Sequence, residues 1–197
     1  MKLVDSPAIY VGDTPATAVY VGDTQVWSAE TVTDSFETDA SVYSGAVQYW
    51  NAGAKFGLAF TANGNVLVHG ARWWRKTTFS ASNPVLHIGA LFSPADASAP
   101  CATEWPADGW ETIQFAAPVA IPTGAERVIW ITTAADVDLA RDATYFPEPR
   151  STLPAGLITS LEPSGRYNLP KHDADDDAPD STADNVWYWL DPLCTPA

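Results

Sequence analysis

The sequence predicts an all-β fold, an antiparallel β-sandwich of jelly-roll or immunoglobulin-like type that follows a small N-terminal β-hairpin or meander. Ile113 and Phe115 alternate with polar Thr112 and Gln114, which is typical of a strand with one buried face. Pro118 interrupts the alternation, as a residue without a backbone donor does at a sheet edge or a bulge. No segment carries a sustained 3.6-residue period with helix caps, so we expect little helix.

A repeated element lies near the N-terminus, with Ile-Tyr-Val-Gly-Asp-Thr at residues 9–14 and Val-Tyr-Val-Gly-Asp-Thr at residues 19–24. In each copy a short apolar strand enters a turn, where Gly permits positive φ and Asp or Thr side chains bond the local backbone. Two such strands are marginal in water by themselves, so we expect residues 1–28 to anchor the chain to neighbouring subunits. The candidate anchor residues are Tyr10, Tyr20, Val21 and Trp27.

The polar residues 29–35 have no apolar period and are the expected linker, which leaves residues 36–197 for the sandwich. Turns such as Asn63–Asn65 separate short apolar segments in this part of the chain. The charged segment 171–184 is expected to be a loop. Strands are expected at residues 54–61, 65–75, 84–92, 110–115, 118–121, 126–133, 143–146 and 185–191.

Nine tryptophans are an unusually high number for 197 residues. They either pack in the sandwich core or form a stacking platform for sugar rings. The alternation along residues 67–75 predicts that Trp73 faces the core and that Trp74 faces solvent. Trp105 lies in a predicted loop, and loops on a rigid sandwich carry recognition. The candidate ligand-binding residues are Trp74, Trp105, Glu104 and Asp108, and the tryptophans expected in the core are Trp110, Trp187 and Trp189.

Four segments, in order, resemble a known domain family. Residues 68–75 are similar to a Val-Thr-Gly-Ile-Arg-Phe-Tyr-Lys strand, and residues 87–93 to a His-Val-Gly-Ser-Leu-Trp-Ser strand. Residues 109–121 resemble the pattern Gly-Trp-x-x-Val-x-Phe-x-x-Pro-Val-x-Ile, and residues 188–191 resemble Tyr-Trp-Val-Asp. These are patterns of DUF4082, a family of unknown function. The resemblance implies a β-sandwich over roughly residues 36–193 and implies no particular activity.

Residues 19–27 also resemble the Val-Tyr-Leu-Gly-x-Thr-x-Val-Trp element of minor tail proteins from phages that infect actinobacteria. This resemblance implies a virion structural protein, of the tail tip or fibre, that presents its sandwich for attachment to the host surface. Its expected partners are other virion proteins, further copies in a homo-oligomer, and a glycan of the host cell envelope. We expect no export signal, because the first residues lack a long apolar region, which fits a protein made in the host cytoplasm and released in virions.

The same features leave alternatives open. A carbohydrate-binding or adhesion module of a bacterial surface protein would carry the same sandwich and loop tryptophans, and a capsid decoration protein would look similar in sequence. An ordinary β-hairpin without a phage connection also accounts for residues 19–27. The sequence shows no nucleophile elbow, zincin motif or phosphate-binding glycine loop, so we expect no enzymatic activity.

Charge and hydropathy narrow the range of partners. Ten Lys and Arg stand against twenty-four Asp and Glu, and the resulting net charge of −14 opposes binding to nucleic acid. No apolar run approaches the roughly 20 residues that span a bilayer, so we expect no membrane insertion.

The acidic segment carries a weak calcium-binding pattern. Asp173, Asp175 and Asp177 have the spacing that opens an EF-hand loop. Ala178, however, stands at the sixth position, where glycine is required, and Asp184 replaces the bidentate Glu of the twelfth. A solvated acidic loop is therefore the default interpretation, and calcium as a cofactor is the alternative.

Two cysteines, Cys101 and Cys194, lie far apart in the sequence. They are either two unpaired, half-buried thiols or a disulfide that ties down the C-terminus. The Cα separation that would decide between the two is not given by sequence.

Overall fold

In a computed structural model of the protein, the described residues are 10–11, 14–15, 18–21, 24–28, 34–36, 46–50, 54–76, 81, 83–134, 137–142, 148–153, 155–168, 177–179, 181–183 and 186–197. The chain divides into two compact units, Met1–Val32 and Thr33–Ala197, here called the N-terminal unit and the sandwich unit. All regular secondary structure among the described residues is β-strand in antiparallel sheets, which confirms the predicted all-β sandwich.

The N-terminal unit contains two antiparallel hairpins in its described residues. In the first, β1 (Tyr10–Val11) pairs with β2 (Thr14–Pro15), and in the second, β3 (Ala18–Val21) pairs with β4 (Thr24–Ser28). Each copy of the repeated element therefore supplies the first strand of a hairpin. The candidate anchor residues lie in these strands, with Tyr10 in β1, Tyr20 and Val21 in β3, and Trp27 in β4.

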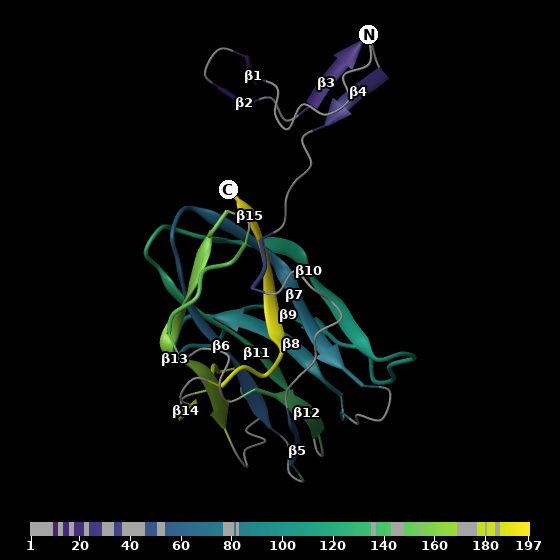
Figure 1. Ribbon diagram of the computed structural model, residues 1–197, viewed down its shortest axis with the longest axis vertical. Coiled ribbons are helices and arrows are strands. Elements are labelled where there is room, and N and C mark those ends of the chain that lie inside the picture. The colour runs from purple at the N-terminus through teal and green to yellow at the C-terminus, as the bar shows by residue number, and fades with distance from the viewer. Residues whose placement is uncertain are drawn as a thin grey trace. The chain divides into compact units, whose positions relative to one another are not determined.

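The sandwich unit is built around two sheets (Figure 1). One has six strands in the order β14-β13-β6-β11-β8-β9, and the other has three in the order β10-β7-β15. A further two-stranded sheet pairs β12 with β5. The strands are β5 (Ala46–Trp50), β6 (Lys55–Ala62), β7 (Val66–Arg75), β8 (Val85–Gly89), β9 (Ala95–Pro100), β10 (Gly109–Ile121), β11 (Glu126–Thr132), β12 (Val137–Arg141), β13 (Ile158–Asn168), β14 (Ser181–Ala183) and β15 (Leu190–Pro196).

Apolar side chains between the two sheets form the core. Phe56 of β6 lies against Trp73 of β7 with ring centroids 5.7 Å apart, so aromatic packing joins one sheet to the other. Core residues alternate along β6, β8 and β11, as a strand with one face toward the core requires. They include Leu58, Phe60, Leu86, Ile88, Ile129 and Ile131.

β10 runs as one strand through the two segments that the sequence separates at Pro118, with a register shift between Gln114 and Val119. The proline thus lies in an irregular stretch, as its missing N–H predicts. Gly70 of β7 pairs with Gln114 beside this irregularity and has a φ of 153°. A Cβ at this position would collide with the carbonyl oxygen of Ile113, so only glycine lets the two backbones approach so closely.

Some strand positions differ from the sequence prediction. The strand expected at 185–191 begins instead at Leu190, because Trp189 has a positive φ of 53° that breaks the extended conformation. β14 lies inside the acidic segment that was expected to be a loop throughout. The strand expected at 143–146 lies outside the described residues. The strands that the sequence does not predict are β5, β9, β12 and β13, which mix apolar residues with polar, small or proline residues.

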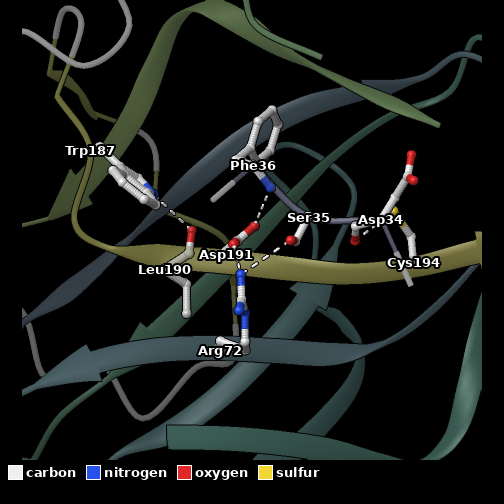
Figure 2. A network of polar contacts seen from close by, with 8 residues as sticks. All are labelled: Asp34, Ser35, Phe36, Arg72, Trp187, Leu190, Asp191 and Cys194. Carbon is white, nitrogen blue, oxygen red and sulfur yellow. Dashed lines mark hydrogen bonds and ion pairs between the residues drawn. The ribbon is translucent and has the colours of Figure 1, made fainter. Parts of the chain in front are cut away.

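The end of the expected linker is instead a buried part of the sandwich. Asp34 forms an antiparallel bridge with Cys194 of β15 (Figure 2), and Ser35 forms one with Leu153. Ser151, two residues from Leu153, bridges in turn to β13 of the six-stranded sheet. Residues from the expected linker therefore connect the two sheets along one side of the sandwich.

Buried polar contacts hold residues 34–36, here called the clasp. The carboxylate of Asp34, which is fully buried, accepts hydrogen bonds from the hydroxyl of Thr152 at 3.0 Å and from the backbone N–H groups of Ala155 and Leu157 at 2.8 Å each. Sequence patterns place this aspartate in a solvated linker, since a charged residue is rarely buried without such partners.

A second carboxylate secures the other end of the clasp. Asp191 of β15 accepts a hydrogen bond from the backbone N–H of Phe36 at 2.7 Å and forms an ion pair with Arg72 of β7 at 2.6 Å (Figure 2). Arg72 also donates to the hydroxyl of Ser35 at 3.1 Å. The clasp is thus fixed by backbone pairing and by two buried acids, so residue 34 is part of the folded unit.

We predict that Asp34→Ala destabilises the sandwich unit by roughly 3 kcal/mol, because the buried Thr152 hydroxyl and the partly buried N–H groups of Ala155 and Leu157 all lose the carboxylate acceptor. The matched control is Asp96→Ala, whose side chain is 49% exposed in an ion pair with Arg127 and should cost less than about 0.5 kcal/mol. Urea unfolding of both variants measures the difference. Equal midpoints for the two variants would contradict the prediction.

Candidate functional site

Trp74, expected to face solvent, is buried with only 6% of its surface exposed. The alternation along β7 does hold, because Trp73 packs on Phe56 between the sheets while Trp74 contacts Trp189, with ring centroids 6.2 Å apart. The backbone N–H of Trp74 also donates to the carbonyl of Trp189 at 3.0 Å. The prediction was wrong because the residues before β15 cover this face, which leaves Trp74 no surface for a ligand.

Trp74 belongs to a cluster of tryptophans that also contains Trp110, Trp187 and Trp189. The rings of Trp187 and Trp189 are stacked with centroids 4.4 Å apart, and both residues are buried as expected. The half-buried Trp110 packs against both rings, and the guanidinium carbon of Arg72 lies 4.8 Å from its ring centroid. The tryptophan cluster therefore packs β7, β10 and the C-terminal segment together.

The other predicted ligand-binding residues lie in the segment that joins β9 to β10. Glu104 and Asp108 are exposed, and Trp105 is half-buried. The structure brings Trp105 to Arg75 of β7, whose guanidinium carbon lies 5.9 Å from the Trp105 ring centroid. The same guanidinium carbon lies 4.6 Å from the ring centroid of Trp73, so aromatic rings from a strand and a loop meet at one cation.

Arg75 is a residue that the sequence reasoning missed. Its side chain is fully buried, and its Nη1 atom donates to the carbonyl of Ala102 at 2.7 Å and to Glu111 Oε2 at 2.9 Å. Glu111 Oε1 accepts in turn from the backbone N–H of Ala102 at 2.6 Å. Register places Glu111 opposite Trp73, two residues from Arg75, so the ion pair follows once the pairing of β7 with β10 is known.

The acidic segment is described only in part. Asp173 and Asp175 lie outside the described residues, so the calcium interpretation stays a prediction. Asp177 is described, and its backbone carbonyl accepts a hydrogen bond from Lys55 Nζ at 3.0 Å. Within the described stretches, no group of three or more His, Cys, Asp or Glu side chains is arranged to hold a metal ion.

Both cysteines are buried and are free thiols. Burial raises the pKa of Cys101 to about 12, with the negative charge of Glu111 as a further cause. Burial likewise raises the pKa of Cys194 to about 12, and the charge of Asp34 acts in the same direction. Thiols with such pKa values stay protonated at neutral pH and are poor nucleophiles.

The fold and these contacts describe a β-sandwich protein with a separate N-terminal hairpin unit. The chain matches the family model of DUF4082, a domain of unknown function, over residues 40–190, and it belongs to this family. A comparison with curated proteins gave no match. For the part of the chain that is described, no helix is long and apolar enough to cross a bilayer.

A solved structure of a clostridial cysteine protease, Cwp84, after propeptide cleavage is similar to this chain with a TM-score of 0.51 and 7% sequence identity. The alignment covers 87% of this chain and 42% of the protease chain, which is less than half of that protein's length. At this identity the likeness concerns the fold alone.

We predict that the folded protein loses stability as pH rises above about 9. Each thiol has a folded-state pKa near 12 against an ordinary value of 9.0, so the folded state holds the proton more tightly, and this contribution is present below pH 9 and lost toward pH 12. Urea midpoints between about pH 8 and pH 11 measure the loss. Tyr and Lys titrate in the same range, so a Cys101→Ala, Cys194→Ala double variant is the control and should show a shallower decline.

Proposed function

We propose that this protein is a structural component of a phage virion, a minor tail protein of the tail tip or fibre that presents its DUF4082 sandwich to the host surface. The observation that supports the proposal most directly is the form of the tail-like element at residues 19–27. This element folds as the β3–β4 hairpin within a compact unit that is separate from the sandwich. One unit is thus available for assembly and the other for display.

The β3–β4 hairpin is suited to completion by another chain. It forms a two-stranded sheet in the described residues, so each strand has an edge that no third strand of that sheet pairs. Apolar, β-branched edges of this kind accept a strand from a neighbour. We infer that other virion proteins or further copies of this chain supply that strand, in a homo-oligomer that follows the symmetry of the particle.

Attachment to the host surface is the proposed role of the sandwich unit. Loops at the ends of a sandwich carry recognition, because the strands hold them in place. The clasp lies along β15, from Cys194 to Asp191. The connection between β9 and β10 lies where β7 ends at Arg75, and it exposes Glu104 and Asp108. A glycan of the host cell envelope is the proposed ligand.

We predict that Tyr20→Asp lowers incorporation of the protein into purified particles by about tenfold, which corresponds to about 1.4 kcal/mol of assembly free energy. The charge would lie in β3, beside the edge that we propose a neighbour pairs. Quantitative immunoblotting of particles measures incorporation, and Glu104→Gln in the exposed loop of the other unit is the control.

Two results would contradict this proposal. Equal incorporation of Tyr20→Asp and the wild-type chain would remove the anchor role of the hairpin. Absence of the wild-type chain from purified particles would remove the virion role altogether, and detection on a bacterial cell surface would then favour the adhesion module.

A further inference from the structure

The environment of Arg75 contains more hydrogen-bond donors than the protein satisfies. Its Nη1 atom donates hydrogen bonds to both Ala102 and Glu111. Its Nε and Nη2 atoms are buried and have no protein acceptor. The indole nitrogens of Trp73 and Trp105, whose rings lie against the same guanidinium, are also buried without an acceptor. Buried donors without acceptors are rare in folded proteins, because they lose their hydrogen bonds to water.

The charge at this position restricts what a ligand can be. Glu111 already forms an ion pair with Arg75 at 2.9 Å, so the positive charge of the guanidinium is balanced. A carboxylate or phosphate ligand would place a second negative charge beside Glu111, in a chain with a net charge of −14. A neutral molecule with hydroxyl or amide oxygens meets the unused donors without this repulsion.

The aromatic rings add a second requirement. The half-buried Trp105 has its ring next to these polar donors, and this combination suits a ligand with apolar C–H surface beside acceptor oxygens. Sugar rings have both kinds of surface. Neutral sugars, including those with an acetamido group, therefore match the chemistry around Arg75 better than acidic sugars do.

Trp105 is the side chain that must move to admit such a ligand. It lies between exposed neighbours, since Glu104 and Pro106 are both exposed, and the segment is tied to the strands at Ala102 by Arg75 and Glu111. We expect rotation of Trp105 to expose the guanidinium while Ala102 keeps its hydrogen bonds with Arg75 and Glu111. A half-buried loop side chain such as Trp105 rearranges more readily than Trp73, which is fully buried in the core.

The end of β7 at Arg75, together with the adjoining β9–β10 connection, is here called the corner. Its position within the sandwich unit also suits recognition. β7 begins at Val66, close to the clasp, because Val68 pairs with Cys194 and Cys194 pairs with Asp34. It ends nine residues later at Arg75, and a rise of about 3.3 Å per residue separates the two ends by roughly 30 Å. The corner therefore lies at the opposite end of β7 from Val66.

We propose that Arg75 and Trp105 form a binding site for a neutral sugar, with Trp105 as a side chain that moves away from the guanidinium to admit it. This inference deepens the proposed attachment function and rests on it for the biological source of the sugar. Arg75 Nε and Nη2 and the Trp105 indole N–H donate to hydroxyl or acetamido oxygens of the sugar. The Trp105 ring contacts its C–H surface.

The test is a titration of the full-length protein by isothermal calorimetry with neutral probes (chitotriose, maltotriose and mannotriose) and with trigalacturonic acid as the acidic probe. We expect saturable binding of at least one neutral probe and binding of trigalacturonic acid at least about tenfold weaker. Trp105→Ala should weaken binding about tenfold or more, and Trp105→Phe, which keeps a ring but loses the N–H donor, about threefold to tenfold. Phe92→Ser is the control, because it removes an aromatic side chain that is 70% exposed at the other end of β9.

The inference is overturned if the folded protein binds none of the neutral probes, if Trp105→Ala binds as tightly as the wild type, or if the acidic probe binds as tightly as the neutral ones. These outcomes are independent of particle incorporation. A chain that is present in particles but binds no neutral probe leaves the virion proposal intact and removes the sugar site. Sugar binding by a chain that is absent from particles supports the site and removes the virion role.

Discussion

Antiparallel pairing of β7 with β10 and β15 is the constraint on which the rest of the sandwich unit depends. β7 is the central strand of the three-stranded sheet, and its two registers decide which side chains meet across it. Register with β15 brings Arg72 to Asp191, and register with β10 brings Arg75 near Glu111. A shift of one residue would turn every side chain of β7 to the other face and separate both pairs.

The polar contacts beside β7 differ between the clasp and Arg75 in how many of their hydrogen-bonding groups have protein partners. Beside the clasp, Asp34 accepts three hydrogen bonds, and Asp191 accepts one from the backbone N–H of Phe36 and forms an ion pair with Arg72. At the far end, Arg75 is buried with donors that no protein group accepts. The carboxylates beside the clasp therefore all have protein donors, whereas Arg75 retains unused hydrogen-bonding capacity.

The distribution of charge follows from the same arrangement. The chain has only ten Lys and Arg, and Lys55 and Arg75 are buried while Arg72 is mostly covered. Three acids, Asp34, Glu111 and Asp191, are buried as well, so the exposed charge stays close to the net charge of −14. This negative charge repels anionic partners. A neutral ligand meets no such electrostatic repulsion.

Local pattern by itself determined the strands with strong alternation. The core faces of β6, β7, β10 and β11, the bulge at Pro118 and the hairpins of the repeated element all follow from periodicity and turn chemistry, since both act over a few neighbouring residues. Strands with small or polar residues, such as β9, give no such pattern, because pairing with neighbours rather than side-chain propensity holds them extended.

Only the tertiary structure decided whether each candidate site residue is buried or exposed and what it contacts. Alternation correctly separated Trp73 from Trp74, but only the position of Trp189 determined that the second face is covered. Asp34 looked like a linker residue until strands distant in sequence supplied its donors, and Arg75 gained its place only when β7 met β10. A strand's sequence records that it has two faces, whereas contacts between residues far apart in the chain decide what lies against each of them.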